Sequence, residues 1–392
     1  MQQLKSGALA MAEELTALRR ELHRHPELGL RELRTARRIE EYLDALGIPH
    51  RRVGETGVWA SIRGEGPGAR AVLLRADIDA LPIQEKNDVP YRSLNDGVMH
   101  ACGHDAHTAC LLGAAKLLAQ RRERFGGEAR LVFQPAEECG NTPEVFISQG
   151  VLDGVDRVFG LHCAPDLPSG TVGLKPGPNN AGVDRFKITF RGVSAHVATP
   201  HLGADALYIA SAFVVGLQGL AARMSDPVEP LILGVGTLHA GTAYNALAET
   251  AVLEGTTRTV AHETRRRVRE QIDCLARSVA ESYGGTASAE WEDFASPLLN
   301  DPETAAEVRG LAEAHWPEKR FIADRAMSMT GDDFSEFILH TPGVYAYLGT
   351  AAPDRPETQH NIHSDRFDLD ETALPLGAWL YAASALHWLK DR

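Results

Sequence analysis

Strand-like and helix-like segments alternate along the first third of the chain, and this alternation constrains the fold more than any other feature. Residues 58–63 and 71–75 have the apolar pattern of strands, and the Gly-rich stretch 64–68 lies between them. Residues 108–122 have helical apolar spacing, and residues 129–134 form another short apolar run. Strands that alternate with helices in this way predict an α/β fold with a mostly parallel central sheet.

The middle of the chain has a different order of elements. Its pattern is strand, helix, two strands, helix and strand, over residues 184–192, 205–224, 231–240, 250–259, 263–283 and 286–293. This βαββαβ order is that of the ferredoxin-like unit. We therefore expect an inserted domain over residues 183–293, flanked by one discontinuous domain made of residues 1–182 and 294–392.

The composition of the chain indicates which classes of binding partner to expect. The formal net charge of −13 argues against nucleic-acid binding, because phosphate backbones attract basic surfaces. We find no apolar run of membrane-spanning length and expect no membrane partner. Residues 1–20 lack the apolar core of a signal peptide, which predicts a cytoplasmic protein. The five cysteines are an odd and sparse set, which favours reduced thiols over a disulfide framework.

Residues 100–107 read His-Ala-Cys-Gly-His-Asp-Ala-His and contain two side chains of metal-ligand type close together. Only Gly103 separates Cys102 from His104, and a residue without Cβ lets the backbone direct both side chains to one point. A thiolate with an imidazole suits zinc and neighbouring transition metals. Asp105 could orient a ligating imidazole from behind. The alternative is a surface histidine cluster beside a buried cysteine.

Acidic residues and one histidine follow three of the strand-like segments. They are Asp77 and Asp79, Glu137 and Glu138, and His162. The carboxyl ends of parallel strands are where sites form in α/β sheets. Asp77 could hold a ligand imidazole or an activated water, and the adjacent carboxylates suit one metal ligand and one general base. Each pattern alone also fits a turn, a solvated acidic loop or a buried structural histidine.

Four further residues are candidates for the site only when they are considered together with the motifs above. His363 lies in a polar loop before the last helix-like segment, and His196 lies in the loop that opens the first helix of the inserted domain. Asn245 and Arg258 lie farther along that domain. Arg258 could hold a carboxylate through two hydrogen bonds, although a surface arginine on a strand is the simpler interpretation.

Several of these motifs, in this order, resemble those of the M20 metallopeptidase family. The matching stretches are residues 23–29, 74–82, 99–108 and 134–138, and the resemblance extends to His363. More narrowly, the sequence is similar to the amidohydrolase branch, which includes N-acyl-amino-acid deacylases, hippurate hydrolases and thermostable carboxypeptidases. The resemblance implies a metal-dependent peptidase-type catalytic domain and a ferredoxin-like lid that also forms a dimer interface.

The resemblance also implies a site for two divalent metal ions per subunit. Cys102 would bridge the ions, His104 and His162 would complete one of them, and Glu138 and His363 would complete the other. Zinc, manganese, cobalt and nickel all fit such ligands, because the order of affinities alone does not decide which metal occupies a site.

The implied function is that of an amidohydrolase that cleaves N-acyl amino acids, an aminoacylase, through a metal-activated water. Glu137 would be the general base, and His196 would stabilise the oxyanion in the neighbouring subunit's site. Asn245 and Arg258 would hold the substrate carboxylate. The small-molecule partner would be an N-acyl amino acid or a short peptide, and the protein partner a second copy bound through the lid.

Two alternatives remain open at this point. The same dinuclear site could serve a dipeptidase or a carboxypeptidase, or the chain could be a non-catalytic, metal-dependent binding protein. The retained Glu137 argues against the second of these. A zinc dehydrogenase is disfavoured, because no Gly-x-Gly-x-x-Gly motif follows a strand.

The sequence departs from the usual family pattern at four places. Asp365 stands where proline is common, and Asp332 stands where glutamate is common. Residues 246–248 replace Val-Ile-Pro, and residues 194–195 replace Gly-Gly. None of these changes removes a metal ligand or the base, so they bear on the loops around the acyl pocket and on the identity of the substrate.

Overall fold

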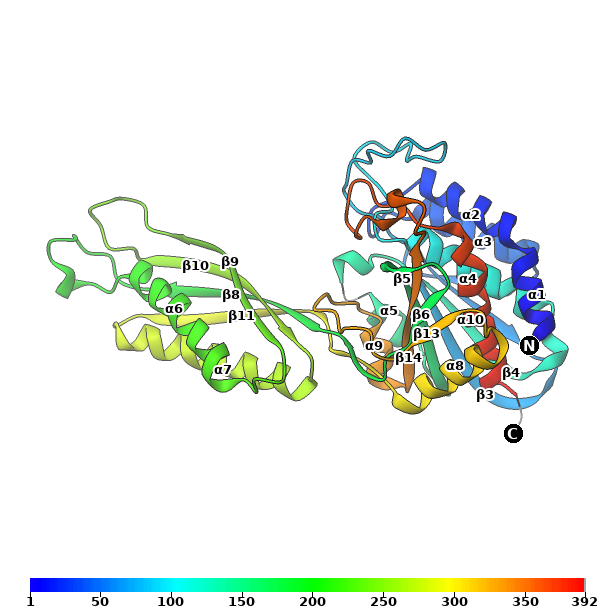
Figure 1. Ribbon diagram of the computed structural model, residues 1–392. Coiled ribbons are helices and arrows are strands. Elements are labelled where there is room, and N and C mark those ends of the chain that lie inside the picture. The colour runs from blue at the N-terminus through cyan, green and yellow to red at the C-terminus, as the bar shows by residue number, and fades with distance from the viewer. Residues whose placement is uncertain (141, 391–392) are drawn as a thin grey trace. The chain divides into compact units, whose positions relative to one another are not determined.

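The chain folds into two compact units in the computed structural model, which describes residues 1–140 and 142–390 (Figure 1). The first unit contains Met1–Asn179, Leu299–Ala326 and the chain from Asp333 onward. The second unit contains Asn180–Leu298 and Met327–Asp332.

A mixed sheet of eight strands forms the centre of the first unit, in the order β1-β2-β4-β3-β5-β14-β6-β13. The strands are β1 (His50–Val53), β2 (Gly57–Arg63), β3 (Gly66–Asp77), β4 (Gly126–Gln134), β5 (Val155–Pro168), β6 (Thr171–Gly173), β13 (Arg320–Ile322) and β14 (Gly343–Ala351). The central strands β4, β3, β5 and β14 are parallel neighbours, whereas β1, β2 and β4 pair antiparallel. The predicted α/β class with a mostly parallel central sheet is confirmed.

The sequence of the central strands follows from their burial on both faces. Residues 71–77 of β3 are all buried, and so is every residue of β14. Parallel strands that helices cover on both faces need continuous apolar runs and not an alternating pattern. This is why residues 71–74 read as an unbroken apolar segment.

Helices cover both faces of this sheet. They are α1 (Gln2–Ala10), α2 (Ala12–Arg24), α3 (Leu33–Ala45), α4 (His104–Ala119), α5 (Pro143–Ile147), α8 (Pro302–His315), α9 (Ser335–His340) and α10 (Leu374–Trp388). Figure 1 shows α1–α4 and α10 on one side of the sheet and the short helices α5 and α9 on the other. α4 and α10 are buried along nearly their whole length, so they lack the polar face of a surface helix.

The remaining short elements of the first unit lie in its connections. Four 3-10 turns are η1 (Arg122–Arg124), η2 (Glu137–Cys139), η4 (Pro356–Gln359) and η5 (Glu371–Ala373). A separate two-stranded sheet pairs β7 (Gly177–Asn180) with β12 (Leu298–Asn300).

The carboxyl ends of β3 and β4 bring two of the acidic segments to the same edge of the sheet. Asp77, the last residue of β3, lies opposite Gln134, the last residue of β4. Beyond the sheet the contact continues, because the N–H of Ile78 donates to the carbonyl of Gln134. The two acid pairs therefore leave the sheet side by side, as parallel strand ends should.

The second unit is a βαββαβ domain with its own core. Its elements are β8 (Gly182–Arg191), α6 (Ala206–Met224), β9 (Leu231–Ala240), β10 (Thr250–Thr259), α7 (His262–Ser282) and β11 (Thr286–Ala295), with the turn η3 (Pro200–Leu202) before α6. The antiparallel sheet has the order β11-β8-β10-β9. Phe186, Phe190, Phe213 and Ile272 fill the space between the sheet and the two helices.

Helix α6 corrects one expectation from the sequence, because it is long and apolar enough to cross a membrane by length and composition. Ile209, Phe213 and Leu217 on this helix are nevertheless buried in the core of the second unit. A helix that packs one apolar face against its own sheet passes the same test as a membrane span, so α6 is weak evidence for one.

Candidate active site

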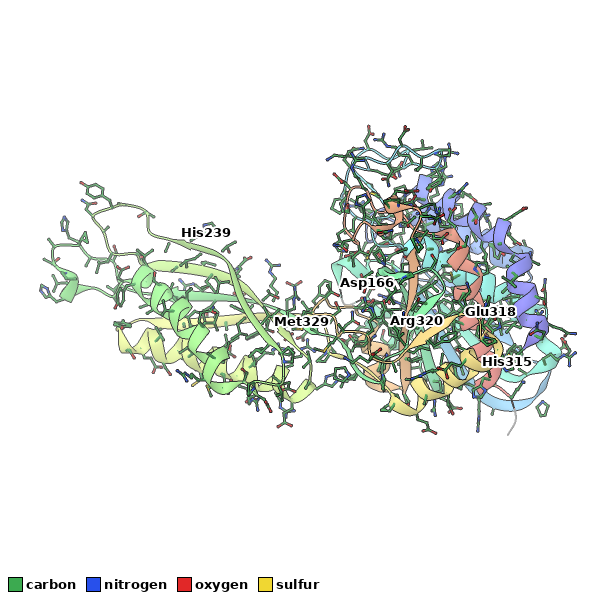
Figure 2. All side chains as sticks on the ribbon, in the orientation of Figure 1. Asp166, His239, His315, Glu318, Arg320 and Met329 are labelled. Atoms are coloured by element: carbon green, nitrogen blue, oxygen red, sulfur yellow. The ribbon has the colours of Figure 1, made fainter. Side chains whose placement is uncertain are left out.

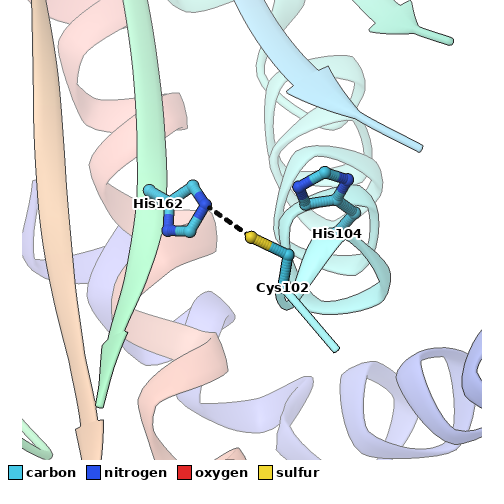
Figure 3. A group of neighbouring side chains, drawn as sticks. All are labelled: Cys102, His104 and His162. Atoms are coloured by element: carbon cyan, nitrogen blue, oxygen red, sulfur yellow. Dashed lines mark hydrogen bonds between the residues drawn. The ribbon is translucent and has the colours of Figure 1, made fainter. Parts of the chain in front are cut away.

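Cys102 and His104, which are two residues apart, come together with His162 from a distant part of the chain (Figure 3). Their ligand atoms all lie within 4.8 Å of one another, and all three residues are buried. Cys102 Sγ is 3.3 Å from His162 Nε2. Gly103 allows the backbone between Cys102 and His104 to lie close to Cys163. Its φ of 91° is left-handed, and a Cβ there would lie 3.0 Å from Cys163 Cβ.

Each of the two imidazoles is oriented by its Nδ1 atom. Asp79 Oδ1 lies 3.0 Å from His104 Nδ1, and the carbonyl oxygen of Cys163 lies 2.7 Å from His162 Nδ1. His104 Nε2 is buried and has no hydrogen-bond partner among the residues that the structure describes. An imidazole that is fixed through Nδ1 and keeps Nε2 available is the usual arrangement of a metal-ligating histidine.

A second group shares Cys102 with the first. The ligand atoms of Cys102, Glu138 and His363 also lie within 4.8 Å of one another. His363 has a left-handed φ of 64°, and its N–H donates to the carbonyl of Ala101 at 2.7 Å, which holds it beside Cys102. Glu138 Oε1 is 3.0 Å from His363 Nε2. Two groups of donors with one cysteine in common could hold two cations that share a thiolate.

The charges around Cys102 fit a cation better than a protein site without one. Burial, followed by the negative charges of Glu138 and Glu137, raises the pKa of the Cys102 thiol well above its usual range. The thiolate is the form that binds a metal, and it needs an adjacent positive charge. Asp77 and Asp79 raise the pKa of His104 to about 10 although burial opposes this. The surroundings of Cys102 and His104 therefore carry strong negative charge and are suited to divalent cations.

Glu137 lies beside these donors on the turn η2. Its carboxylate, the His104 imidazole and the Glu138 carboxylate form a further group within 4.8 Å. Glu137 is buried with 7% of its surface exposed. A carboxylate beside the ligands, on the same turn as one of them, is placed to exchange a proton with a molecule bound there.

Two expectations from the sequence, about which acids orient the ligating imidazoles, are corrected. Asp77 orients His107, with Oδ1 at 2.6 Å from His107 Nδ1, and its contact with His104 Nε2 is longer, at 3.8 Å. Asp105 holds His23, with Oδ2 at 2.7 Å from His23 Nδ1. The reason is topological: Asp77 is the last residue of β3, whereas Asp79 lies beyond the strand, where side chains no longer alternate regularly between two faces. The sequence alone does not show which of the two acids faces the ligand.

The other three predicted site residues lie in the second unit, at opposite ends of its sheet. The backbones of His196 and Ala246 form a β-bridge, and the N–H of Val197 donates to the carbonyl of Asn245, so His196 and Asn245 are neighbours. Arg258 is near the far end of β10. At about 3.3 Å per residue, the strand from Thr250 to Arg258 spans on the order of 25 Å. One subunit therefore cannot place Asn245 and Arg258 on the same carboxylate.

Arg258 has the charge and an unused buried donor atom that an anion-binding residue needs. Its Nη1 atom is buried without a hydrogen-bond partner in the described part of the chain, and burial lowers the pKa of its guanidinium. A buried, unpaired donor on a cationic group is costly unless a ligand completes it.

Sequence reasoning missed two buried residues near the site. His107 Nδ1 faces Asp77, and its Nε2 accepts the N–H of Cys163 at 2.8 Å. Glu32 accepts the N–H of Ala136 at 2.8 Å, next to Glu137. His107 belongs to the motif at residues 99–108, and Glu32 lies just beyond the motif at residues 23–29. Nothing in the local spacing of either residue shows what it contacts.

The fold and the donor groups define a metal-binding hydrolase, and comparison with known proteins identifies its family. The model of the family "Peptidase family M20/M25/M40" matches residues 73–387. This is more than half of the chain, and the chain belongs to that family, as the motifs predict. It is accordingly a hydrolase that acts on amide bonds.

Relatives with established names support this class over nearly the whole chain. The chain is 41% identical over 376 residues to N-acetyl-L-cysteine deacetylase of Bacillus subtilis (strain 168), covering 96% of this chain and 88% of that one. It is 36% identical over 391 residues to thermostable carboxypeptidase 2 of Saccharolobus solfataricus, covering 98% of each. A solved structure of a dinuclear metal-binding M20 peptidase from Bacillus subtilis superimposes with a TM-score of 0.84 at 35% identity, covering 97% and 99% of the two chains.

Proposed function

We propose that the protein is a dinuclear metal amidohydrolase that cleaves the amide bond of N-acyl amino acids. The observation that carries this proposal is the pair of donor groups that share Cys102, with the buried carboxylate of Glu137 beside them. Cys102, His104 and His162 would hold one cation, and Cys102, Glu138 and His363 the other. When bound, the cations would polarise the scissile carbonyl and lower the pKa of a water molecule.

Proton transfer and substrate binding are the tasks of the chain's own residues. Glu137 takes a proton from the attacking water and delivers it to the leaving amine when the C–N bond breaks. Arg258 binds the free carboxylate of the amino-acid part and fixes the register of the amide against the site. The comparison that tests the proposal is turnover of N-acetyl amino acids against dipeptides, with zinc, manganese, cobalt and nickel each supplied in turn. Absence of turnover of every N-acyl amino acid would reject it.

A carboxypeptidase or dipeptidase activity of the same site is the second candidate. It is favoured by the similarity to a protein named thermostable carboxypeptidase. Faster hydrolysis of dipeptides than of acetyl amino acids in the same panel would establish it.

Removal of the Arg258 guanidinium should affect substrates with a free α-carboxylate selectively. We expect Arg258→Ala to raise KM for an N-acyl amino acid and to lower kcat/KM by on the order of 10²-fold, since a charge-assisted bidentate pair is lost. The corresponding N-acyl amino-acid amide, already a poor substrate, should change little. Measurement of kcat/KM for both substrates decides the matter, and an equal loss for both would make Arg258 a structural residue.

We further propose that the second unit is a lid and dimerisation domain through which two copies associate. Two exposed apolar surfaces support this. Strand β9 is an edge of its sheet and carries the exposed side chains of Ile232, Leu238 and His239, of which Figure 2 labels His239. Tyr208 and Val215 are exposed on α6. An open strand edge with apolar neighbours is a surface that another chain can pair with.

The separation within the second unit supports a site to which two copies contribute. Because His196 and Asn245 lie far from Arg258, a complete site that uses all three residues needs contributions from two copies. In this arrangement Arg258 serves one carboxylate-binding position, and the partner's loop supplies the oxyanion donor His196.

Mixing two inactive variants should therefore restore activity. In a mixed dimer of His196→Ala and Glu137→Gln, one site combines an intact Glu137 with a His196 from its partner. We expect activity to reappear, toward about one quarter of the wild-type specific activity after complete random exchange at equal concentrations, because half of the dimers are mixed and each has one complete site. No recovery after exchange has been verified, for example by mass spectrometry of differently tagged subunits, would place His196 in its own subunit's site or outside the mechanism.

A further inference from the structure

Glu32 is a wholly buried acid whose partner is not in its own helix. It precedes α3, it has 0% of its surface exposed, and its side chain makes no capping hydrogen bond to that helix. Glu27 caps the first turn of α3 instead. Its carboxylate accepts hydrogen bonds from the N–H groups of Arg34 and Thr35. The side chain of Glu32 is therefore not needed to start the helix that follows it.

The Glu32 carboxylate holds the backbone on one side of Glu137. Its Oε1 atom accepts the N–H of Ala136 at 2.8 Å. Ala136 has a φ of 55°, in the left-handed region that residues with a Cβ rarely adopt. Such a conformation persists only where surrounding contacts impose it. On the other side of Glu137, the N–H of Glu138 donates to Asp79 Oδ2 at 3.0 Å.

The segment that carries Glu32 is packed tightly against this turn. A Cβ at Gly29 would lie 2.8 Å from Cys139 Sγ and 3.2 Å from Ala136 Cα. Leu28 and Ala80 form a β-bridge, and the N–H of Ala80 donates to the carbonyl of Glu27. Residues 27–32 therefore lie between the two segments that leave the sheet, where only glycine at position 29 permits the approach.

We propose that Glu32 is a positioning residue for Glu137: it holds Ala136 in the left-handed conformation that directs the Glu137 carboxylate toward the bound substrate. The effect on catalysis rests on the proposed function, because it requires Glu137 to be the base. The effect on the turn itself does not, and it can be measured in the metal-free protein.

The direct test is hydrogen exchange of the peptide that contains residues 133–139. We expect Glu32→Ala to speed exchange of this peptide by about tenfold or more, which corresponds to the loss of a hydrogen bond in a locally opened turn. Glu32→Gln keeps an acceptor oxygen for the N–H of Ala136, so it should exchange like the wild type. Glu27→Ala is the matched control: it should lower global stability without a selective effect on this peptide.

The catalytic test separates positioning from general destabilisation. Glu32→Ala should keep its bound metal and its KM but lose kcat by up to about 10²-fold, the effect of a misplaced catalytic group. Ala136→Gly removes the cost of the left-handed conformation, so it should restore part of the kcat in the double variant with Glu32→Ala. Gly29→Ala, which displaces the turn while keeping Glu32, should reproduce the same pattern if Glu32→Ala does not fold.

Several outcomes would overturn the proposal. These are unchanged exchange of residues 133–139 in Glu32→Ala, equal losses of kcat in Glu32→Ala and Glu27→Ala, or no rescue by Ala136→Gly. Faster exchange with an unchanged kcat would reject the positioning of the base while leaving the contact with Ala136 intact. Full activity of Glu137→Gln would instead reject the proposed role of Glu137, so the two failures are distinguishable.

Discussion

We expect Glu137→Gln to reduce kcat by about 10²–10⁴-fold, the typical contribution of a positioned general base. Glutamine has nearly the shape of glutamate but cannot accept the proton of the attacking water. Glu137 is buried beside the donor groups, so a substitution of equal size should preserve the packing of the turn. The variant should therefore keep its metal and still bind an N-acyl amino acid, which elemental analysis and calorimetric titration would measure beside the steady-state rate.

Glu138→Gln is the matched comparison, because Glu138 is the next residue on the same turn. Its carboxylate lies 3.0 Å from His363 Nε2 in the group that shares Cys102. We expect this variant to bind metal more weakly, because an amide is a poorer ligand than a carboxylate, and to regain activity in part when metal is added in excess. Loss of metal from Glu137→Gln with full retention in Glu138→Gln would show that the two roles are exchanged.

Cys102→Ala should have the second large effect, on metal binding itself. Because the two candidate donor groups have Cys102 in common, its removal takes a ligand from both cations at once. Loss of a residue that only hydrogen-bonds a metal ligand can lower metal affinity by up to about 10²-fold. Cys102 would be a ligand itself, so we expect the affinity for at least one cation to fall by more than this. Metal content after dialysis should drop, and the rise in Tm that added metal gives to the wild type should become smaller.

Cys110→Ala provides the control for this experiment. Cys110 is also a buried free thiol, in α4, and its Sγ contacts the carbonyl of Leu374. Its replacement should lower stability by a packing loss of about 1 kcal/mol or more without changing the metal content. An unchanged number of bound ions in Cys102→Ala would exclude the shared-thiolate arrangement.

The sequence by itself determined the features that depend on local order. The alternation of strands and helices predicted the α/β class, because the period of apolar residues follows from which faces of each element are buried. Most elements begin and end close to the predicted residues, and the strands at residues 231–240 and 250–259 do so without any shift. The motifs around Cys102 and Glu137 predicted the family, since several of them occur in a fixed order.

Only the tertiary structure decided which partner each polar side chain meets. Asp79 and not Asp77 orients His104, and Asp105 turns to His23. Glu32 reaches Ala136 across 104 positions of the chain. These pairings depend on the direction in which each strand end and turn presents its side chains. A shift of one residue reverses that direction within a strand, and beyond the end of the strand the regular alternation no longer holds.

The distance between Asn245 and Arg258 in the second unit was also decided by the tertiary structure. In the sequence, Asn245 and Arg258 lie within one short stretch and were predicted to act together on one carboxylate. The extended strand β10 between them carries the two residues to opposite ends of the sheet. Proximity in sequence becomes separation in space whenever the intervening residues form a strand, because each residue of a strand adds about twice the rise of a helical residue.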